Sequence, residues 1–580
     1  MKLLSDLLST MTKIRLSWLI KASIFQLLFV TVANFVLSEF FYFILSVTGQ
    51  YHLDKDNFLT FLKNPVALAL LFAYLLLLAA FIHLEFFALY RIIADREVSV
   101  NGFKKRISYY LRRIWKTFSG YQILLFVVYV LLTIPVLNLG LSSVITEKLY
   151  VPEFIVGELS KTAMMKYLLY VVFACLFYLN LRLIYFLPLL AIKHRTVKEA
   201  FKESWQKTKK HQLTLVIKLL AISGITFLFL LTASFIILAL ACFFNPSGNQ
   251  VIVQTLSLTM IWELIFFATI FVKLCSAIML KEGIVPQRTI DARKTSVKYQ
   301  KYYAVLLVLL TLGFACQSLD RLAFFQKPTP KTIIAHRGLV SAGVENSLEA
   351  LEGAKKAKSD YVELDLILTK DNQFVVSHDN NLKRLAGVDE NIRELTLVEV
   401  EHLSSHQGSF SSHFVSFETF YKRAKALNMP LLIELKPTGS EPDNYVDLFL
   451  ETYHKLDIGK ENKVMSLNLK VMEAIEKKDP SITTGYVIPI QFGLFGDEKV
   501  DFYVIEDFSY RSYLSTQAVR KKKEVYVWTI NDSSRMEHYL LKPIQGIITD
   551  KPALTRQLSK ELTKDTSYFE RLMNIISSLY

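Results

Sequence analysis

The chain has 580 residues, of which 52% are hydrophobic and 13% aromatic, and its formal net charge is +15. This length excludes a single ordinary domain and predicts two or three. The apolar content is too high for a wholly soluble protein. All four cysteines precede residue 317, so we expect neither a disulfide nor a cysteine metal site in the C-terminal part.

Long apolar stretches dominate the N-terminal half. Most of them exceed the ~20 residues that a helix needs to cross a bilayer. The first is too long, and too unlike a cleavable signal, to be removed. We therefore predict that residues 1–320 form an all-α multi-pass membrane bundle. Its seven spanning helices are expected near residues 17–47, 65–93, 121–145, 166–192, 213–244, 251–280 and 302–319, the last being the shortest.

The connecting segments alternate in charge. Segments 94–120, 193–212 and 281–301 each carry six or seven Lys or Arg residues and two acids, whereas the segments between them are nearly neutral. Basic loops stay in the cytoplasm. This pattern predicts a bacterial plasma-membrane protein with a cytoplasmic N-terminus and, after seven crossings, an extracellular C-terminal domain. An even number of crossings would leave that domain in the cytoplasm.

The basic excess is therefore a signal of topology, and we expect no nucleic-acid partner. Two partly amphipathic runs, 103–116 and 197–210, predict helices lying on the anionic inner leaflet. Ionisable residues within or beside apolar stretches are functional candidates, although pairing and snorkelling near helix ends also explain them. These residues are Glu85, Arg91, Arg182, Glu263 and Lys273.

The composition changes near residue 320. We assign 321–330 to a linker, 331–554 to a catalytic domain and 555–580 to a helical tail that packs on this domain or rests on the membrane. Short apolar runs alternate with helical patterns, which predicts a parallel sheet, and a (β/α)8 TIM-type barrel fits better than an open sheet. Segment 380–415 is irregular, as an insertion over the barrel mouth would be. Strands are expected near 332–336, 360–367, 373–377, 431–436, 483–488, 502–505, 525–530 and 546–549.

Carboxylates gather on two of these strands. Glu363 and Asp365 are two residues apart and so face the same side of their strand, and Glu434 and Lys436 repeat this spacing. If both pairs face the barrel mouth, three carboxylates meet in a hard-oxygen site suited to Mg²⁺, Ca²⁺ or Mn²⁺. The alternative is that these acids form ordinary salt bridges with Lys436 and Arg337.

Two histidines and two cations accompany the acids. His336 and His378 each end or follow a strand, which suits general acid–base chemistry near neutral pH. Arg337 and Lys436 supply fixed positive charge for a phosphate. These residues together predict metal-dependent hydrolysis of a phosphodiester or phosphomonoester.

The same residues resemble the motifs of the glycerophosphodiester phosphodiesterase family. The resemblance covers about 331–554, and the apolar half resembles the multi-pass membrane domain fused to this enzyme in some bacterial members. The motifs are His336-Arg337-Gly338, Glu345-Asn346, Glu363-x-Asp365, His378-Asp379-x-x-Leu382-x-Arg384, Glu434-x-Lys436, Trp528-Thr529-x-Asn531 and Gly546-x-x-Thr549-Asp550.

The resemblance implies a (β/α)8 barrel that hydrolyses glycerophosphodiesters to glycerol 3-phosphate and an alcohol. His336 and His378 would be the general acid–base pair. Glu363, Asp365 and Glu434 would hold one divalent metal ion, Ca or Mg, or else Mn. Either the neighbouring glycerol hydroxyl would attack and give a cyclic phosphate, or water would attack directly; the sequence leaves both open.

The resemblance also assigns roles to the surrounding residues. Arg337 and Lys436 would bind the phosphate. Glu345 would orient His336 or approach the metal. Trp528 would wall the glycerol or leaving-group pocket, or else pack at the barrel rim. The family usually continues with threonines after Arg384, but residues 385–387 here are Leu-Ala-Gly, which leaves the role of this arginine open.

The expected partners are a glycerophosphodiester or lipid-derived substrate and membrane lipid. Two alternatives remain. The first is a phospholipase C- or D-like enzyme that acts on intact lipids or glycerophosphate polymers. The second is a non-catalytic membrane receptor or transporter whose barrel is a binding module. The leaving-group alcohol and the oligomeric state are left open by the sequence.

Overall fold

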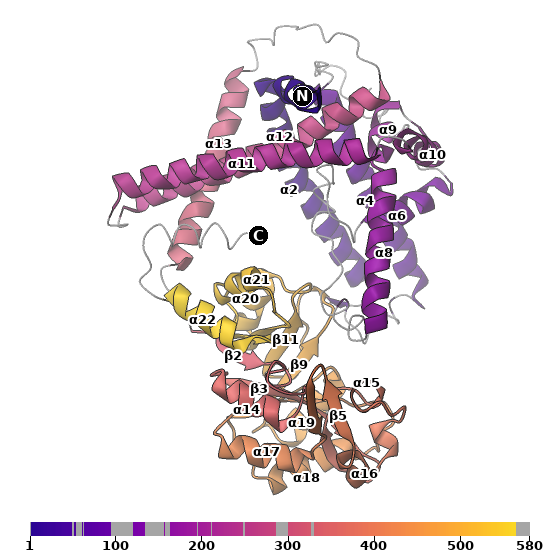
Figure 1. Ribbon diagram of the computed structural model, residues 1–580, viewed down its shortest axis with the longest axis vertical. Helices are drawn as coiled ribbons and strands as arrows, with labels where there is room; N and C mark the ends of the chain where they lie inside the picture. Colours follow the sequence, from indigo (N-terminus) through magenta and orange to yellow (C-terminus); the bar gives the residue numbers. More distant parts are fainter. Residues whose placement is uncertain are drawn as a thin grey trace. The chain divides into compact units, whose positions relative to one another are not determined.

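In the computed structural model the chain forms two compact units. The first consists of helices and extends to Leu322; the second begins at Ala323 and also includes two short segments that come earlier in the chain. Each unit is described by itself (Figure 1). The structure describes residues 2–48, 52–53, 61, 63–93, 120–133, 156, 163–193, 195–209, 212–246, 250–285, 300–325 and 330–563.

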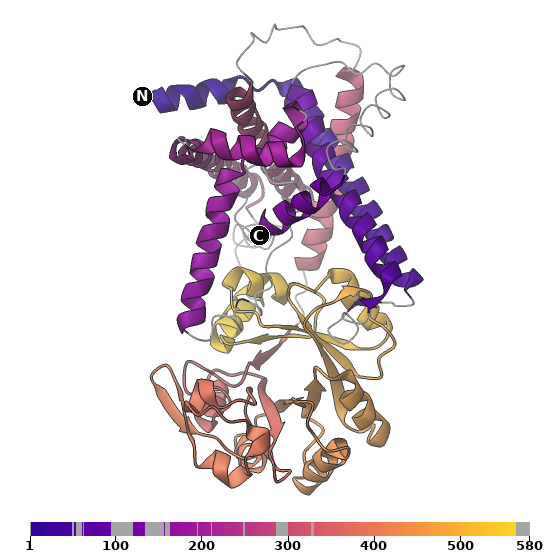
Figure 2. The ribbon, with the colours of Figure 1, turned by 90° about the vertical axis from the view of Figure 1, so that its right-hand side faces the viewer.

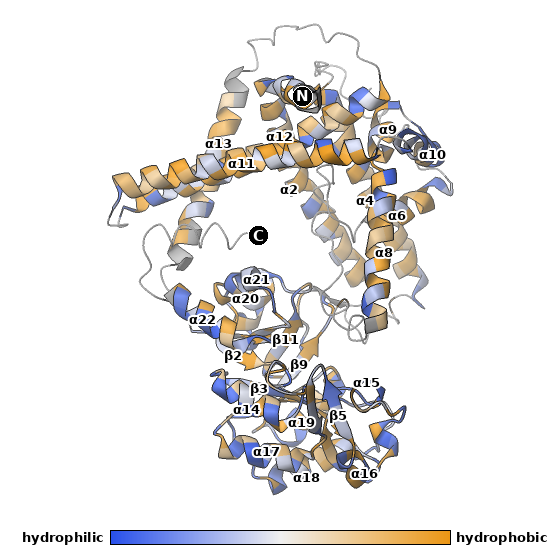
Figure 3. Cartoon of the chain, viewed as in Figure 1, coloured by the Kyte–Doolittle hydropathy of each residue, from blue (hydrophilic) through white to orange (hydrophobic). Residues whose placement is uncertain are grey.

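The first unit is helical, and apolar residues dominate its longest helices (Figure 3). Its described helices are α1 (Lys2–Thr12), α2 (Leu16–Val47), α4 (Pro65–Ile93), α6 (Gln122–Thr133), α8 (Ala163–Arg182), α9 (Phe186–Lys193), α10 (Val197–Thr208), α11 (Gln212–Phe244), α12 (Val251–Ile284) and α13 (Gln300–Phe325).

Five segments in the described part of this unit are long and apolar enough to cross a membrane, against the seven expected. The apolar part of α13, Ala304–Leu319, is shorter because polar residues occupy both ends of this helix. Of the stretch 121–145, the described helix ends at Thr133, and the rest lies outside the described residues. The five segments are Leu16–Val47, Pro65–Ile93, Met164–Lys193, Gln212–Phe244 and Val251–Ile284.

One of these segments is interrupted. Helix α8 ends at Arg182 and α9 begins at Phe186, with a turn between them. Pro188 explains the break, because its ring displaces the carbonyl four residues earlier and its nitrogen cannot donate a hydrogen bond. The side chain of Tyr185 is thereby placed at the junction of the two helices.

The described part of the run 197–210 forms α10 (Val197–Thr208), and whether this helix also rests on lipid stays a prediction. Thr196 caps this helix in a capping box with Glu199. Val197 and Ala200 are buried in the same apolar cluster as Phe186 of α9. The apolar face of α10 is therefore covered by protein. The other amphipathic run, 103–116, lies outside the described residues.

Two of the ionisable residues singled out in the apolar stretches pair with each other. Glu85 Oε1 accepts hydrogen bonds from Lys273 Nζ at 2.6 Å and from Gln26 Nε2 at 2.9 Å, and all three side chains are buried. The pair joins α4 to α12, and Gln26 adds α2. Because an unpaired charge is costly in an apolar interior, this contact holds the three helices in register.

The second unit is a closed barrel of eight parallel strands flanked by helices, as the sequence predicted. The sheet runs β2-β13-β12-β11-β9-β8-β7-β3, and a pairing of β2 with β3 closes it. The barrel strands are β2 (Thr332–Ala335), β3 (Tyr361–Leu368), β7 (Leu431–Leu435), β8 (Lys463–Ser466), β9 (Thr483–Ile488), β11 (Phe502–Glu506), β12 (Glu524–Trp528) and β13 (Gly546–Thr549).

Two strand assignments differ from the prediction. Strand β4 (Phe374–Val376) pairs antiparallel to the end of β3 and lies outside the barrel. The missing barrel strand is β8, whose four residues Lys-Val-Met-Ser include only two apolar ones and gave little signal. Helices cover the barrel: α14 (Leu348–Lys356), α17 (Phe417–Ala426), α18 (Tyr445–Lys455), α19 (Leu469–Lys478), α20 (Ser512–Arg520), α21 (Ser533–Leu540) and α22 (Pro552–Thr563).

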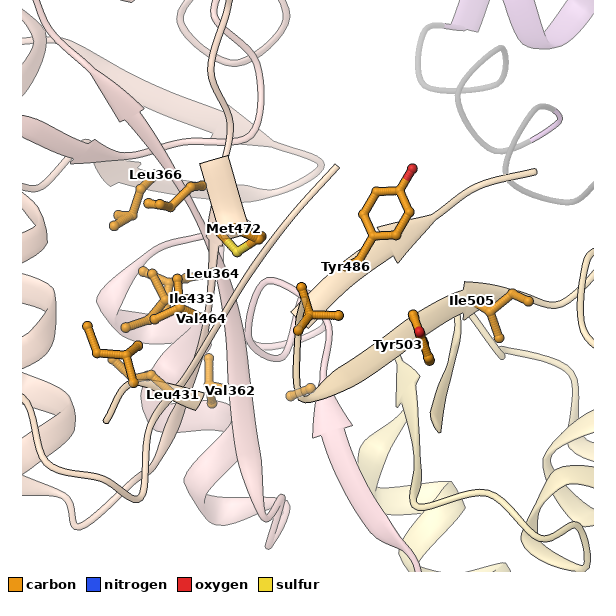
Figure 4. Packing of buried hydrophobic residues seen from close by; sticks show 14 of the residues in the cluster. Val362, Leu364, Leu366, Leu431, Ile433, Val464, Met472, Tyr486, Tyr503 and Ile505 are labelled. Carbon is orange, nitrogen blue, oxygen red and sulfur yellow. The ribbon is translucent and has the colours of Figure 1, made fainter. Parts of the chain in front are cut away.

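Side chains alternate along β3, and this alternation separates core from site. Val362, Leu364 and Leu366 face outward into the main apolar cluster between sheet and helices (Figure 4). Tyr361, Glu363 and Asp365 face the other way, into the barrel. Each fully buried aliphatic side chain on the outer side stabilises the fold by roughly 1.5–3 kcal/mol, which fixes the direction of the inward residues.

Segment 380–415 has more regular structure than expected. It contains α15 (Lys383–Ala386), the 3-10 helix η3 (Ile392–Glu394) and α16 (Leu397–Glu401). It ends in an antiparallel hairpin of β5 (Ser404–Gln407) and β6 (Phe410–His413). These elements share an apolar cluster of their own, which includes Val375 of β4. The segment is thus a packed insertion. Of the expected tail, residues 564–580 lie outside the described part.

Candidate active site

Three carboxylates meet at the C-terminal ends of neighbouring strands. Asp365 of β3 and Glu434 of β7 are direct register partners, and Glu363 precedes Asp365 by two residues. One oxygen from each of the three lies within 4.8 Å of the others. Their exposed fractions are 2% for Glu363, 1% for Asp365 and 8% for Glu434. The pairing register therefore delivers the predicted cluster.

Burial and mutual repulsion shift the pKa values of the three carboxyl groups. Burial, followed by repulsion from Asp365 and Glu434, raises the pKa of Glu363 well above its ordinary value. Burial also raises the pKa of Glu434. Burial opposes ionisation of Asp365 too, but Lys436, His378 and Arg337 outweigh it and lower its pKa. Three ionised carboxylates this close require additional positive charge.

The donor set fits a hard divalent cation. Oδ1 of Asp365 is buried and makes no hydrogen bond within the described part of the chain, and Lys436 Nζ lies 3.4 Å from it. Carboxylate oxygens are the ligands that Mg²⁺, Ca²⁺ and Mn²⁺ prefer. Glu363, Asp365 and Glu434 could therefore hold such an ion.

The turn after β2 carries Arg337 into the cluster. Its φ of 54° is left-handed, and Gly338 follows with a φ of 81°. A Cβ on Gly338 would lie 2.8 Å from Ala350, so a side chain is excluded there. The Arg337 backbone N–H donates to Glu363 Oε2 at 2.7 Å. Its guanidinium lies 3.1 Å from Glu345 and 3.4 Å from Asp365. The arginine is thus fixed beside two acids.

Asn346 orients one of the acids, a role that the motif alone did not reveal. It adopts a φ of 61°, and its backbone N–H donates to the Arg337 carbonyl at 2.9 Å. Its side-chain amide donates to Asp365 Oδ2 at 2.8 Å and accepts from the Asp365 backbone N–H at 3.3 Å. One oxygen of Asp365 is therefore held by Asn346 while Oδ1 faces the cluster.

His336 forms a dyad with Asp550. Its Nδ1 lies 2.8 Å from Asp550 Oδ1. The other Asp550 oxygen accepts from Asn531 Nδ2 at 2.6 Å, and Asn531 Oδ1 accepts the Asp550 backbone N–H at 2.8 Å. Burial opposes ionisation of Asp550, but His336 and Asn531 outweigh it and lower its pKa. Because a carboxylate only accepts, Nδ1 carries the proton and Nε2 is available for chemistry.

His378 forms a second dyad, with its neighbour Asp379, at 2.6 Å between Nδ1 and Oδ1. Arg384 binds the other Asp379 oxygen at 2.5 Å and reaches Glu345 Oε2 at 2.9 Å. Burial lowers the pKa of His378 to about 4. Arg384 therefore joins this dyad to Glu345, a pair of contacts that the sequence did not predict.

Glu345 lies at the centre of this network. Burial would raise its pKa, but the hydrogen bond from Arg384 and the charges of Arg337 and Arg384 lower it to about 2. Gln407 of the β5–β6 hairpin binds both its backbone N–H, at 2.7 Å, and its side-chain Oε2, at 2.9 Å. Among the described residues, Glu345 is bound by Arg337, Arg384 and Gln407, and neither His336 nor the acid cluster contacts it.

Lys436 and Trp528 complete the set. Burial opposes the charge of Lys436, but Glu434 and Asp365 outweigh it and raise its pKa. Trp528 ends β12, and its Nε1 donates to the Val504 carbonyl at 3.2 Å. The ring packs against the cluster that fills the barrel interior. It is therefore fixed at the inner rim of the barrel.

The structure thus brings the predicted residues to the C-terminal end of one barrel. Sequence reasoning assigned no role to Asp550, Asn346 or Gln407. The first two stand inside the quoted motifs, which was the available signal. Gln407 lies 62 residues from its partner Glu345 in a hairpin with no recognisable polar pattern, so no sequence signal pointed to it.

Residues 4–315 match the membrane domain of glycerophosphoryl diester phosphodiesterase, and residues 336–554 match the glycerophosphoryl diester phosphodiesterase family. The chain belongs to the glycerophosphodiester phosphodiesterase family. This family consists of phosphoric diester hydrolases, and the membrane domain places the chain at a membrane.

Curated relatives match the barrel. YhdW of Bacillus subtilis, a candidate glycerophosphodiester phosphodiesterase, is 26% identical over 237 residues, which cover 38% of this chain and 94% of that protein. The glycerophosphodiester phosphodiesterase of Bacillus subtilis is 25% identical over 39% of this chain and 86% of its own length. The human lysophospholipase D GDPD1 is 48% identical, over 12% of this chain and 21% of its own.

Solved structures align with the same part. A glycerophosphodiester phosphodiesterase from Parabacteroides distasonis is 23% identical, covers 40% of this chain and 98% of that chain, and has a TM-score of 0.36. An Oleispira antarctica phosphodiesterase, solved with the product sn-glycerol-3-phosphate, is 20% identical, covers 40% and 97%, and has a TM-score of 0.36.

Proposed function

We propose that this chain is a membrane-anchored, divalent-metal-dependent hydrolase that cleaves glycerophosphodiesters to glycerol 3-phosphate and an alcohol. The observation that carries the proposal is the buried triad of Glu363, Asp365 and Glu434, whose oxygens approach within 4.8 Å, beside two carboxylate-bound histidines. Such a triad is costly to bury unless a cation occupies it.

The triad would hold one Mg²⁺, Ca²⁺ or Mn²⁺, which when bound would stabilise negative charge on the phosphate oxygens and so lower the barrier to attack on phosphorus. Arg337 and Lys436 lie beside the triad and would bind the remaining phosphate oxygens. Both cations already contact the acids, so they offset part of the negative charge, and the remainder favours a bound metal ion. Trp528 would wall the pocket for glycerol or the leaving group.

His378 would take the proton from the attacking hydroxyl, either of water or of the neighbouring glycerol carbon. Two observations support this assignment: Nδ1 is bound to Asp379, and burial lowers the pKa of His378 to about 4, so the ring is neutral at neutral pH and the lone pair of Nε2 is free to act as a base. His336, held by Asp550, would give a proton to the leaving alcohol. Glu345 would position the His378 dyad through Arg384 and would not bind the ion.

We further propose that the barrel lies outside a bacterial plasma membrane and the N-terminus inside. The alternating loop charges support this orientation. The proposed domains are 1–320 in the membrane, a linker at 321–330, the barrel at 331–554 and a tail at 555–580.

The test is release of glycerol 3-phosphate from glycerophosphocholine and glycerophosphoglycerol by the purified full chain. We expect activity that a chelator abolishes and added divalent metal restores. His378→Ala should be inactive, whereas His402→Ala, a substitution of an exposed histidine on the barrel insertion, should retain full activity. Undiminished release in excess chelator would refute the metal site.

A second function deserves the same assay because a short segment of the chain matches a human lysophospholipase D at 48% identity. In this alternative the same residues cleave a lysophospholipid instead of a deacylated diester. Release of choline from lysophosphatidylcholine, at a higher kcat/KM than from glycerophosphocholine, would favour it. Intact phospholipids and glycerophosphate polymers belong in the same comparison.

A further inference from the structure

A cavity of about 650 Å³ lies within the helical unit, far along the chain from the catalytic residues. It forms where α1, α10, the start of α11 and the end of α12 meet the turn between α8 and α9. The residues that line it are Ser9, Thr10, Lys13, Tyr185, Lys207, Thr208, Thr214, Leu215, Lys218, Met279, Glu282 and Gly283.

The lining is cationic. Among the residues that the structure describes, three lysines and one glutamate face this cavity. Lys13 Nζ lies 2.7 Å from Glu282, so that acid is neutralised locally. Lys207 Nζ donates to the Gly283 carbonyl at 2.8 Å, which holds its ammonium group at the wall. The cavity therefore presents a net positive charge of about two, which suits a phosphate anion.

Neutral hydroxyl donors surround these cations. Tyr185 lies against Gly283, where an added Cβ would stand 2.6 Å from the tyrosine hydroxyl oxygen. A side chain at position 283 would displace this hydroxyl, so the glycine leaves room for it in the wall. Thr214 also contributes a hydroxyl group, whereas the buried hydroxyl of Thr208 is bound to the Ser204 carbonyl at 2.9 Å. Hydroxyl groups beside lysines are the partners that phosphate oxygens use in proteins.

We propose that this cavity binds the phosphate of an anionic phospholipid headgroup. Two of the helices that form it, α11 and α12, are candidate membrane spans, and the cavity lies at the start of one and the end of the other. Ends of spanning helices lie at headgroup level, and basic pockets between them recognise anionic headgroups. Leu215 and Met279 add apolar lining for the first part of an acyl chain.

This site is independent of the hydrolytic reaction, because none of its residues belongs to the barrel. By the loop-charge rule the cavity lies on the cytoplasmic side, because Lys207 and Thr208 belong to the basic segment 193–212 and Glu282 and Gly283 to the basic segment 281–301. The occupant is therefore a resident lipid of the inner leaflet. It would tie α1 and α10 to the α11–α12 hairpin.

The test compares two double variants of the full chain in detergent, each titrated with short-chain phosphatidylglycerol and followed by native mass spectrometry. Lys207→Gln with Lys218→Gln removes two charges from the cavity. Lys198→Gln with Lys209→Gln removes two charges from exposed positions on and just after α10. We expect the cavity variant to bind roughly 10- to 30-fold more weakly than wild type, and the control to bind as wild type.

Two further arms identify the ligand. Thr214→Glu, which places a negative charge at the cavity, should also lose phosphatidylglycerol, while circular dichroism shows unchanged helix content. Phosphatidylcholine should bind weakly, and millimolar inorganic phosphate should not displace the lipid. Equal weakening in both double variants would overturn the site in favour of diffuse surface attraction. Displacement by phosphate alone would overturn the lipid in favour of a soluble anion.

Discussion

At the scale of single residues, the active site is a set of charges that hold one another in place. Arg384 binds Asp379 and Glu345 together, and Asn346 fixes one oxygen of Asp365. Each histidine is oriented by a carboxylate of its own. Such preorganisation matters because a general base must present the correct nitrogen to its substrate.

Asp550→Asn should lower kcat on glycerophosphodiesters on the order of 100-fold, since an asparagine amide can donate toward Nδ1 and so favour the wrong tautomer of His336. The pH–rate profile should change along with kcat. Steady-state kinetics of the full chain would measure both. Asp389→Asn, the same change at an exposed aspartate, is the control. An unchanged kcat in Asp550→Asn would contradict the dyad.

Glu345 makes a prediction about stability and pH. Its pKa is about 2 in the folded chain, against an ordinary 4.5. A depressed pKa contributes stability that is complete above the unfolded value and is lost as pH falls through the folded value. The difference between the folded and the ordinary pKa corresponds to about 3 kcal/mol of folding stability at neutral pH. The free energy of unfolding of wild type should therefore fall between pH 5 and pH 2.

The control for this prediction is Glu345→Gln, which cannot titrate. The full chain in detergent would be unfolded thermally at several pH values, with wild type and variant side by side. The stability difference between them should shrink as pH falls below 4.5. Parallel curves across the whole range would show that Glu345 is not held ionised by its arginines.

At the scale of elements, the insertion between β4 and α17 supplies part of the site. Gln407 of the β5–β6 hairpin hydrogen-bonds Glu345, which in turn binds Arg384 of the His378 dyad. The insertion therefore supports this dyad. This explains why the insertion is packed around its own apolar cluster. A loose hairpin could not hold a buried hydrogen bond.

Gln407→Ala should leave the buried Glu345 backbone N–H without its partner, at a cost of roughly 1–2 kcal/mol in stability. Arg384 binds both Glu345 and Asp379, so a displaced Glu345 would also disturb the His378 dyad. We therefore expect kcat to fall several-fold. Chemical denaturation and steady-state kinetics would measure the two effects. Ser411→Ala, on the exposed side of β6, should change neither. Wild-type kinetics in Gln407→Ala would remove the hairpin from the site.

The elements also show what the sequence could predict. Seven of the eight barrel strands follow from apolar runs bounded by polar residues, and the acid pair follows from the two-residue repeat along β3. Strand β8 escaped because two of its four residues are polar. Two contacts could not be predicted because no local sequence pattern encodes them. The Gln407–Glu345 contact joins residues 62 positions apart, and the His336–Asp550 contact joins residues 214 positions apart.

At the scale of the whole molecule, a bundle with several candidate spans is more than an anchor requires. We expect it to bring the barrel to lipid-linked substrates. A barrel without residues 1–320 should hydrolyse glycerophosphocholine in solution at a kcat/KM close to that of the full chain. It should lose activity on lipid-linked glycerophosphodiesters presented in vesicles.

Parallel assays of both proteins on both substrates would measure this difference, with the full chain in the same vesicles as the reference. If the isolated barrel acts equally well on free and lipid-linked substrates, the bundle has no part in substrate choice. The barrel must first be shown to fold, for which its activity on the soluble substrate is sufficient.

The register of β3 against β7 has a consequence for folding. Asp365 faces Glu434 across the pair, and outward neighbours such as Leu364 and Ile433 face each other in the apolar layer. A shift of one strand by a single residue would turn each of its side chains to the opposite face of the sheet. The acids would then point into the helix layer, and leucines would point into the barrel mouth. No partly slipped barrel can keep a working centre. Turnover is therefore a stringent assay of correct strand alignment, and loss-of-function variants need a separate measurement of fold.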